Sequence, residues 1–463
     1  MKEGVSSYMF SKRWKGRGGY REVLNLAIPL IVSTGAVGIQ EFVDRMFLSW
    51  YSLESIAAAM PAGILYFSIL SLFLGTAGYV NAFVAQYFRA ERHEHIGPSL
   101  WQGIYIALAG GGLTMLLAPL APVLFRLIGH PAEVQRLEIV YFRILCYGAF
   151  FPIASSALSG FFSGIGRPQP VMWVNMAATV VNIVLNYLLI FGNMGFPEMG
   201  IAGAALSTVI SGGFGCAVFF GLALRRHHRK TYNTGRGWAP DRELLLRLIR
   251  FGFPSGVQFF IEIFAITAFI LLIGRLGMVQ LAATNIAFNI NSLAFMPMLG
   301  LGMAISVLVG QYLGENREDL AERSVYSGSV ISFLYMGSIA LAYVVIPNIF
   351  VGIFSSRGDP ELFDQISRIA VVLLRFVALY SLFDTMNIVF ASAIKGAGDT
   401  RFVMVMMLAL SMGILVIPSY LYLVVFKGNI YVAWIFITAY IVILGFGFLF
   451  RFLGGRWKSM RVI

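Results

Sequence analysis

Long apolar segments separated by short polar connections run through almost the whole chain. A bilayer has a hydrocarbon core of about 30 Å, which an α-helix crosses in roughly 20 residues. Twelve segments are long enough, and we place them at residues 23–50, 56–87, 99–125, 134–162, 169–192, 200–224, 246–274, 280–313, 324–350, 364–394, 402–426 and 430–452. This pattern predicts an all-α integral membrane protein with twelve transmembrane helices.

Composition supports this prediction. Of 463 residues, 58% are hydrophobic and only 12% are charged, with a mean hydropathy of +0.79. Soluble domains carry about 25% charged residues. The formal net charge of +12 comes from 34 Lys and Arg against 22 Asp and Glu. Placing both termini in the cytoplasm gathers most basic residues in cytoplasmic loops, as the positive-inside rule requires. The excess therefore indicates orientation in the membrane and not a nucleic-acid surface.

The sequence lacks the motifs that are typical of several other classes of protein. Cys146 and Cys216 each lie alone in an apolar segment, which predicts neither a disulfide framework nor a zinc site. The chain has no GxxxxGK[ST] phosphate loop, no HExxH or GxSxG motif, and no TVGYG-like filter. We therefore expect no enzyme activity, no catalytic residues and no cofactor.

The two halves of the chain repeat one another. At offsets of 225 and then 232 residues, equivalent positions match: Pro29 and Pro254, Gly75 and Gly300, Gln86 and Gln311, Tyr87 and Tyr312, Arg143 and Arg375, and Gly164 and Gly396. The repeat predicts an N-terminal six-helix lobe with a basic tail, residues 1–232, and a C-terminal six-helix lobe, residues 233–463. Since each unit has an even number of spans, a pseudo-two-fold axis along the membrane normal should relate them. Secondary transporters are commonly built this way.

Away from the helix ends, four acidic residues fall inside the predicted spans: Glu41, Asp44, Glu262 and Asp384. A charged side chain at the bilayer centre costs roughly 2.5–3.5 kcal/mol on insertion scales. Such groups therefore face the bundle interior or a water-filled cavity, and they usually bind something. An ion pair between helices is the alternative, and Arg45 stands four residues after Glu41, in the right place for one.

Glu262 and Asp384 are the strongest candidates for a binding site. No basic residue lies within one helical turn of either, and their repeat equivalents are Val37 and Pro152, so the repeat does not require the acids. Tyr380 precedes Asp384 by four residues and shares its helix face. If both carboxylates share one cavity, a proton or a sodium ion would relieve their repulsion. Either ion would then drive transport.

A second polar cluster is predicted in the first half. Asp44 is its acid, Asn182 and Asn186 are four residues apart on one helix face, and Thr208 adds a hydroxyl. Oxygen ligands of this kind suit a hard cation such as Na⁺. The alternative, that the Asn and Thr side chains only hydrogen-bond across helices, stays open.

Several motifs resemble those of the multidrug and toxic compound extrusion (MATE) family. Phe42-Val43-Asp44 ends the first span, Gly310-Gln311-Tyr312 ends the eighth, and Gly-x-Gly follows the fourth and tenth spans. The likeness extends over roughly residues 20–455. Glu262 lies fifteen residues before Gly277, and Asp384 twelve before Gly396, spacings that resemble the NorM-type branch.

This resemblance implies coupling roles for Glu262, Asp384 and Tyr380. It also implies a second cation site, formed by Asp44, Asn182, Asn186 and Thr208. The chain departs from the family pattern at Arg45, where a small or polar neutral residue is expected beside the acid.

The expected function is an antiporter of the bacterial inner membrane. It would export organic, cationic and amphipathic compounds such as drugs and dyes by alternating access, coupled to Na⁺ or H⁺. We expect a monomer with cytoplasmic termini, no nucleic-acid partner, and no metal beyond Na⁺ at the coupling residues. A flippase for a lipid-linked precursor is an alternative, disfavoured because we expect no Lys or Arg in the interior apart from Arg45. An ion channel is a further alternative. The sequence leaves the coupling ion, the stoichiometry and the natural substrate open.

Overall fold

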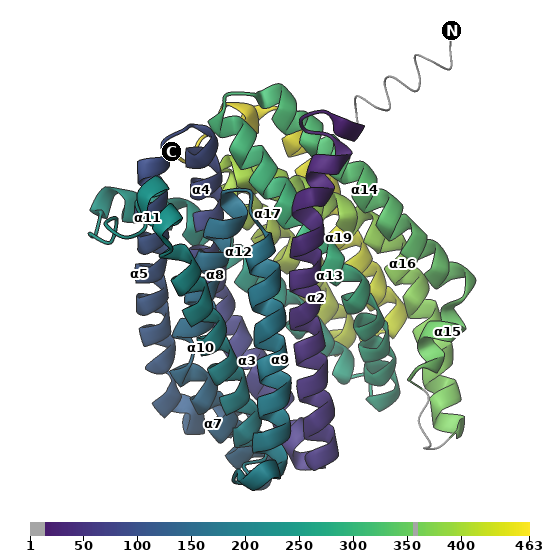
Figure 1. Ribbon diagram of the computed structural model, residues 1–463. Coiled ribbons are helices and arrows are strands. Elements are labelled where there is room, and N and C mark those ends of the chain that lie inside the picture. Colours follow the sequence, from purple (N-terminus) through teal and green to yellow (C-terminus); the bar gives the residue numbers. More distant parts are fainter. Residues whose placement is uncertain (1–13, 355–359) are drawn as a thin grey trace. The chain divides into compact units, whose positions relative to one another are not determined.

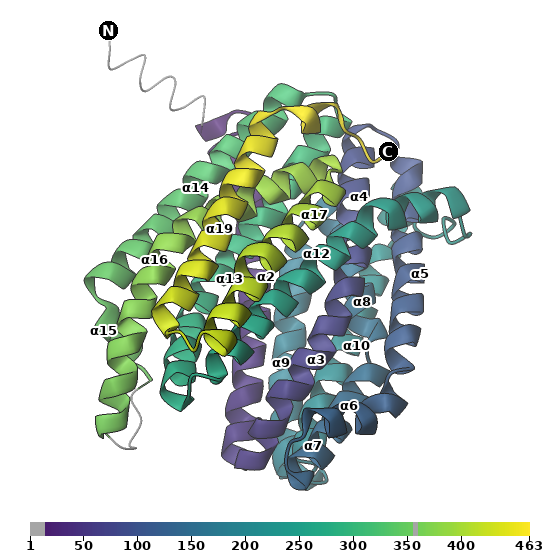
Figure 2. The same ribbon diagram turned by 180° about the vertical axis from the view of Figure 1, so that it is seen from behind.

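A computed structural model of the chain describes residues 14–354 and 360–463, and every regular element in these ranges is a helix (Figures 1 and 2). Eleven helical segments are long and apolar enough to cross a membrane. A bent pair of shorter helices supplies a twelfth span. The predicted all-α architecture with twelve spans is confirmed.

The first half of the chain contains six spans, three of them built from two helices each. In order, the helices are α2 (Tyr20–Tyr51), α3 (Leu53–Gly78), α4 (Val80–Arg89), α5 (Ile96–Met115), α6 (Ala121–Ile128), α7 (Ala132–Tyr147), α8 (Phe150–Gly164), α9 (Gln169–Phe191) and α10 (Ile201–Ala223). The helices α7 and α8 form the bent pair, with an angle of 44° between them. Short 3₁₀ turns at His93–His95, Ala118–Leu120 and Asn193–Gly195 complete the connections.

The second half follows a basic connection that contains the short helix α11 (Arg226–Thr231). Its helices are α12 (Arg242–Gly274), α13 (Met278–Gly314), α14 (Glu318–Val345), α15 (Pro347–Gly352), α16 (Pro360–Ala397), α17 (Thr400–Leu410), α18 (Ile417–Tyr420) and α19 (Ile430–Leu453). The π-helical stretch Ser411–Val416 joins α17 to α18, and a second one, Leu421–Val425, continues the same span beyond α18. A 3₁₀ turn covers Arg456–Ser459. The order of spans agrees with the sequence prediction.

Two compact units can be distinguished, and they interleave along the chain. One is drawn from Met1–Ile31, Ile261–Leu313 and Arg317–Met460. The other is drawn from Val32–Phe260, Gly314–Asn316 and Arg461–Ile463. The long helices α2 and α12 therefore each contribute residues to both units. The division into lobes at residue 232 stays a prediction from the repeat.

Repeat-related residues make the same helix contact once inside each unit. A Cβ on Gly75 of α3 would lie 2.7 Å from the Cα of Gly256 on α12. A Cβ on Gly300 of α13 would lie 2.6 Å from the backbone nitrogen of Ile31 on α2. Gly300 is the repeat equivalent of Gly75, and Gly256 that of Ile31. Glycine lets the two backbones approach this closely, so the internal repeat is visible in the packing as well as in the sequence.

Candidate functional site

Glu262 and Asp384 are brought into one neighbourhood by α12 and α16. Both side chains are half-buried. The two carboxylates lie close enough for their charges to interact. They belong to the same compact unit, although 122 residues separate them in the sequence. A coupling role for the two acids stays a prediction from the sequence.

Polar side chains surround Asp384 and its neighbour Tyr380. Asn387 donates a hydrogen bond from Nδ2 to Oδ1 of Asp384 at 3.1 Å. The Tyr380 side chain interacts electrostatically with Asp384, accepts a hydrogen bond from Asn291 at 3.4 Å, and stacks on the Trp434 ring at a centroid distance of 6.5 Å. The Oδ1 atom of Asn291 is buried and has no hydrogen-bond partner in the described residues. A carbonyl oxygen of this kind is available to a cation.

Two further residues reach this cluster and were not predicted from the sequence. Tyr440 of α19 interacts electrostatically with both carboxylates, while its hydroxyl donates to the sulfur of Met407 at 2.8 Å. Lys395 of α16 interacts electrostatically with Glu262. The predicted tenth span ended at residue 394, but α16 continues to Ala397 and includes Lys395. The expectation that no interior Lys or Arg occurs apart from Arg45 is therefore wrong.

The first-half cluster is also partly assembled. Asn186 of α9 donates from Nδ2 to the carboxylate of Asp44 on α2 and, at 3.0 Å, to Oδ1 of Asn182. Both Asn side chains are fully buried. Their remaining atoms, Nδ2 of Asn182 and Oδ1 of Asn186, have no hydrogen-bond partner in the described part of the chain. The hydroxyl of Thr208 instead donates to the carbonyl of Ala204, one turn back on its own helix, at 3.1 Å.

Arg45 pairs with Glu41, as its spacing predicts. The guanidinium lies 3.8 Å from the Glu41 carboxylate, and the two side chains are 54% and 51% exposed. Tyr141 of α7, which the sequence did not single out, interacts electrostatically with Asp44.

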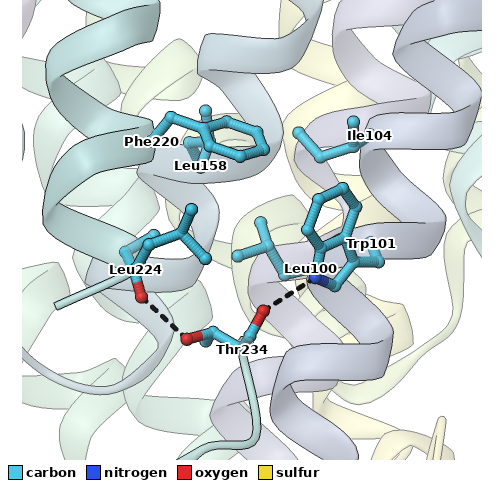
Figure 3. Close-up of a pocket in the computed structure, with 8 residues that line it drawn as sticks. Leu100, Trp101, Ile104, Leu158, Phe220, Leu224 and Thr234 are labelled. Carbon is cyan, nitrogen blue, oxygen red and sulfur yellow. Dashed lines mark hydrogen bonds between the residues drawn. The ribbon is translucent and has the colours of Figure 1, made fainter. Parts of the chain in front are cut away.

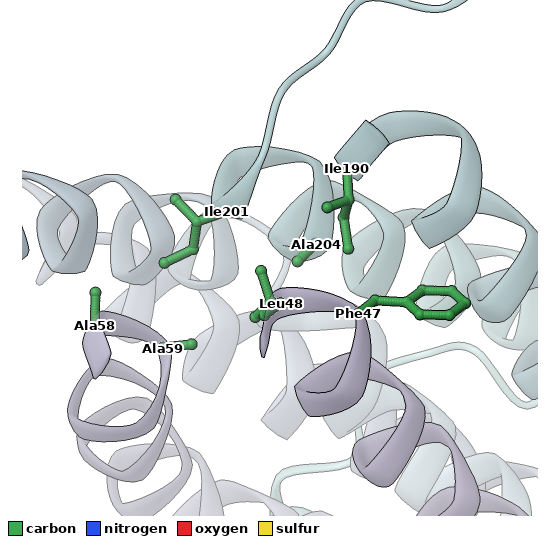
Figure 4. Close-up of a cluster of buried hydrophobic side chains, with 7 residues drawn as sticks. All are labelled: Phe47, Leu48, Ala58, Ala59, Ile190, Ile201 and Ala204. Carbon is green, nitrogen blue, oxygen red and sulfur yellow. The ribbon is translucent and has the colours of Figure 1, made fainter. Parts of the chain in front are cut away.

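A buried apolar cluster fixes the end of α2 that carries Asp44 (Figure 4). It draws on the end of α2, the start of α3, the end of α9 and the start of α10. Its members are Phe47, Leu48, Ala58, Ala59, Ile190, Ile201 and Ala204. Because the cluster begins about one turn beyond Asp44, it also holds the carboxylate in register with α9.

A small crevice near the connection between the repeats is mainly apolar, unlike the two acidic clusters (Figure 3). It is lined by Leu100, Trp101, Ile104, Leu158, Phe220, Ala223, Leu224 and Thr234. Thr234 holds the connection in place, because its carbonyl accepts from Nε1 of Trp101 at 2.9 Å and its hydroxyl donates to the carbonyl of Ala223 at 2.8 Å. None of the lining residues ionises, so the crevice does not compete with the acidic clusters as a coupling site.

Comparison with known proteins identifies the family. The MatE family model matches residues 29–188 and 254–421, which together make up more than half of the chain and fall in both repeats. The chain therefore belongs to the MATE family of membrane transporters, and it is a multi-pass transporter and not an enzyme.

Relatives and solved structures agree with this assignment. "Probable multidrug resistance protein NorM" of Pseudomonas putida is 31% identical over 385 residues, covering 82% of each chain. The protein of the same description from Thermotoga maritima is 24% identical over 450 residues, covering 96% of this chain and 94% of the relative. The NorM-type resemblance is thereby confirmed. A solved MOP superfamily transporter from Pyrococcus furiosus has a TM-score of 0.86 at 21% identity, covering 97% of this chain and 98% of that one, which shows the shared fold.

Proposed function

We propose that the protein is a cation-coupled multidrug antiporter that uses Na⁺ or H⁺ and resides in the bacterial inner membrane. The observation that carries this proposal is the interaction between the charges of Glu262 and Asp384, two carboxylates on membrane-spanning helices. Relatives described as multidrug resistance proteins support the choice of substrate class. No cofactor takes part.

Coupling follows from the repulsion between the two carboxylates. A bound cation offsets that repulsion and stabilises one facing state of the transporter, whereas the drug stabilises the other. Each ligand shifts the balance only by the difference between its affinities for the two states. Alternating access then exchanges an inward-moving cation for an outward-moving drug.

The neutral ligands around the acids favour Na⁺ as the first ion to test. The phenol of Tyr380 and the unpartnered Oδ1 of Asn291 are oxygen donors of the kind that hard cations take. A proton needs only one carboxylate, so H⁺ remains the second candidate. A second cation site at Asp44, Asn182, Asn186 and Thr208 belongs to the same proposal, because the Thr208 hydroxyl that donates to the carbonyl of Ala204 keeps its oxygen lone pairs for a cation.

The substrates we propose are organic, cationic and amphipathic compounds. Aromatic and Met side chains, of which the chain has 40 Phe, 20 Tyr and 20 Met, adapt to flat cations of many shapes. The positive-inside rule places both termini in the cytoplasm. We propose a monomer, since each chain carries both repeats.

Efflux of ethidium from proteoliposomes tests the proposal. A sodium gradient and a proton gradient are imposed separately, and at least one should drive efflux by the wild type. Glu262→Gln and Asp384→Asn should each abolish the driven component while the protein still inserts. Glu133→Gln, which removes an exposed carboxylate on α7, is the matched control and should behave like the wild type. Full driven efflux by both acid variants would remove the pair from the mechanism.

The flippase alternative needs a basic cavity for a phosphorylated headgroup. Lys395 is an interior base, but its charge already interacts with Glu262. Transfer of a labelled lipid-linked precursor across vesicles, with no driven ethidium efflux, would favour the flippase.

A further inference from the structure

The connection between the repeats, residues 224–241, has an inner and an outer face. On the inner face, the rings of His228 and Tyr232 contact the Phe161 ring of α8 at centroid distances of 5.6 and 5.9 Å. No acidic residue occurs between Glu198 and Asp241. The outer face therefore carries only positive charge, on five exposed bases: Arg225, Arg226, Arg229, Lys230 and Arg236.

Hydrogen bonds fasten the main chain of the connection along α5. Three of its carbonyls accept from residues spaced four apart on that helix. The pairs are Gly97 with Tyr232 at 2.8 Å, Trp101 with Thr234 at 2.9 Å, and Tyr105 with Trp238. Between the first and the last donor the helix rises about 12 Å. The connection, with α11, therefore lies beside a membrane-spanning helix for about two turns (Figures 1 and 2).

This course keeps the bases close to the membrane surface. The helix α10 has 23 residues and ends at Ala223, and a helix needs about 20 residues to cross the hydrocarbon core. Arg225 and Arg226 follow directly, so they lie at the depth of the lipid headgroups. The side chain of Trp238 is 60% exposed. Tryptophan is enriched at the interface between membrane and water, which suits the same position.

No carboxylate of the protein neutralises the outer face. None of the five bases forms an ion pair with any of the residues that the structure describes. Arg229 lies against the loop that carries Arg236, because a Cβ on Gly235 would be 2.5 Å from the Arg229 Nε. The exposed Arg167, between α8 and α9, follows a turn whose Phe162 ring contacts His228 at 5.7 Å. The counter-charges must therefore come from outside the chain.

We propose that this basic face, formed by Arg225, Arg226, Arg229, Lys230 and Arg236 with Trp238, is a docking surface for the headgroups of anionic phospholipids. Guanidinium groups bind phosphate oxygens through paired hydrogen bonds, and clustered bases beside a membrane-spanning helix attract anionic lipids. Because the main chain is already fastened to α5, binding orders few further groups. The positive-inside rule accounts for the sign of the charge, but it requires neither this fastening nor an exposed Trp238.

Native mass spectrometry of the full-length protein, supplied with equal amounts of phosphatidylglycerol and phosphatidylcholine, tests the proposal. The wild type should retain phosphatidylglycerol preferentially. Arg229→Gln combined with Lys230→Gln should reduce this preference about tenfold. Arg401→Gln combined with Arg456→Gln is the matched control, because it removes the same charge from two exposed bases of the second half, and it should keep the preference. Equal losses in the two double variants would overturn the assignment to this face.

A nitroxide attached to Thr231→Cys locates the face relative to the lipid. Thr231 is exposed beside Lys230, whereas Cys146 and Cys216 are buried and should escape labelling. In nanodiscs that contain phosphatidylglycerol, the nitroxide should be less accessible to a neutral nickel chelate in the water than in nanodiscs of phosphatidylcholine alone. Arg229→Gln with Lys230→Gln should abolish the difference. Equal accessibility in the two kinds of nanodisc would overturn the proposal.

Soluble anions added to the phosphatidylcholine nanodiscs test for other occupants. Neither inorganic phosphate nor poly-glutamate should shield the nitroxide from the chelate. Shielding by phosphate would make the face a site for a free anion, and shielding by poly-glutamate would make it a docking surface for an acidic protein segment. Either result would overturn the assignment to lipid headgroups.

Discussion

Asn186 on α9 donates a hydrogen bond from its side-chain amide to the carboxylate of Asp44 on α2, across 142 residues of sequence. The same amide also donates to Asn182, so one side chain joins the acid to a second buried amide. Hydrogen bonds to ionised groups are about twice as strong as neutral ones. This pair of hydrogen bonds therefore holds α2 against α9 at the position of Asp44.

Asn186→Ala should lower the stability of the protein. It removes the donor to Asp44 and leaves a half-buried carboxylate without that partner, a loss of about 1.5–3 kcal/mol for a hydrogen bond to a charged group. Thermal unfolding in detergent measures the effect as a lower midpoint. Asn193→Ala is the control, because the Asn193 amide donates only to the carbonyl of Tyr187 near a helix end. An equal midpoint for both variants would show that the bond to Asp44 is weak.

Gly256→Ala should disrupt the packing of α3 against α12. The added Cβ would lie 2.0 Å from the carbonyl oxygen of Leu72 and 2.4 Å from the hydroxyl of Thr76. Since the nearer atom is backbone, the two helices must move apart, and overpacking of this kind costs about 1–3 kcal/mol or more. The yield of monodisperse protein and its unfolding midpoint should both fall.

Gly112→Ala on α5 is the matched control for this substitution. No atom lies within 4 Å of a Cβ placed there. Alanine is the better helix former by about 1 kcal/mol, so this variant should be as stable as the wild type or slightly more stable. Equal unfolding midpoints for Gly256→Ala and Gly112→Ala would contradict the close approach of α3 and α12.

The sequence predicted the helices well because the bilayer sets their length locally. Roughly 20 apolar residues are needed wherever a helix crosses, and no tertiary contact enters that requirement. The predicted end of this span, residue 394, fell short of the end of α16 at Ala397. A local pattern places the membrane boundary at a charged residue such as Lys395, unless an opposite charge on another helix faces that residue. Glu262 is that partner, and its position relative to Lys395 depends on tertiary structure.

The sequence identifies only those candidate site residues whose type is rare inside a membrane-spanning segment. Acids inside apolar segments stand out, so the sequence singles out Asp44, Glu262 and Asp384 as candidates. Tyr141 and Tyr440 sit among many aromatic residues, and nothing local shows that their hydroxyls face an acid. Thr208 was grouped with the first-half cluster by residue type, yet a threonine in a helix commonly bonds the carbonyl one turn back.

Arg451→Met should destabilise the second half of the chain strongly. The Arg451 side chain lies 2.7 Å from the Asp399 carboxylate and stacks over the Phe402 ring at 4.5 Å, and Asp399 is only 8% exposed. Removing one partner of a buried pair leaves the other charge uncompensated, at a cost of about 3–5 kcal/mol. Unfolding by heat or denaturant measures the loss.

Arg368→Met provides the comparison for Arg451→Met. Arg368 pairs with Asp364 at 2.6 Å, but the two side chains are 79% and 57% exposed. Exposed pairs contribute about 0–1 kcal/mol, so this variant should unfold close to the wild type. Similar losses in both arginine variants would mean that burial of Asp399 does not govern the strength of its pair.

His228 should make the connection between the repeats sensitive to acid. Burial lowers the pKa of His228 below its ordinary value of 6.5, and the nearby positive charges of Arg167 and Arg225 act in the same direction, while a hydrogen bond with the Leu222 carbonyl opposes them. The folded connection therefore prefers the neutral ring. Its stability is fully present above pH 6.5 and falls as the pH drops from there toward the lowered pKa, because the unfolded segment takes up the proton first.

Hydrogen exchange at residues 226–238, corrected for intrinsic rates, measures this effect between pH 7.5 and 5.5. Protection should decrease on acidification in the wild type. It should become independent of pH in His228→Phe, which keeps an aromatic ring against Tyr232, where His228 stacks at 5.9 Å. His227→Gln removes an exposed neighbour whose positive charge helps to lower the pKa of His228, so this variant should keep a smaller decrease in protection on acidification. Protection that stays constant in the wild type, or that loses its pH dependence in His227→Gln instead, would show that His228 does not control the connection.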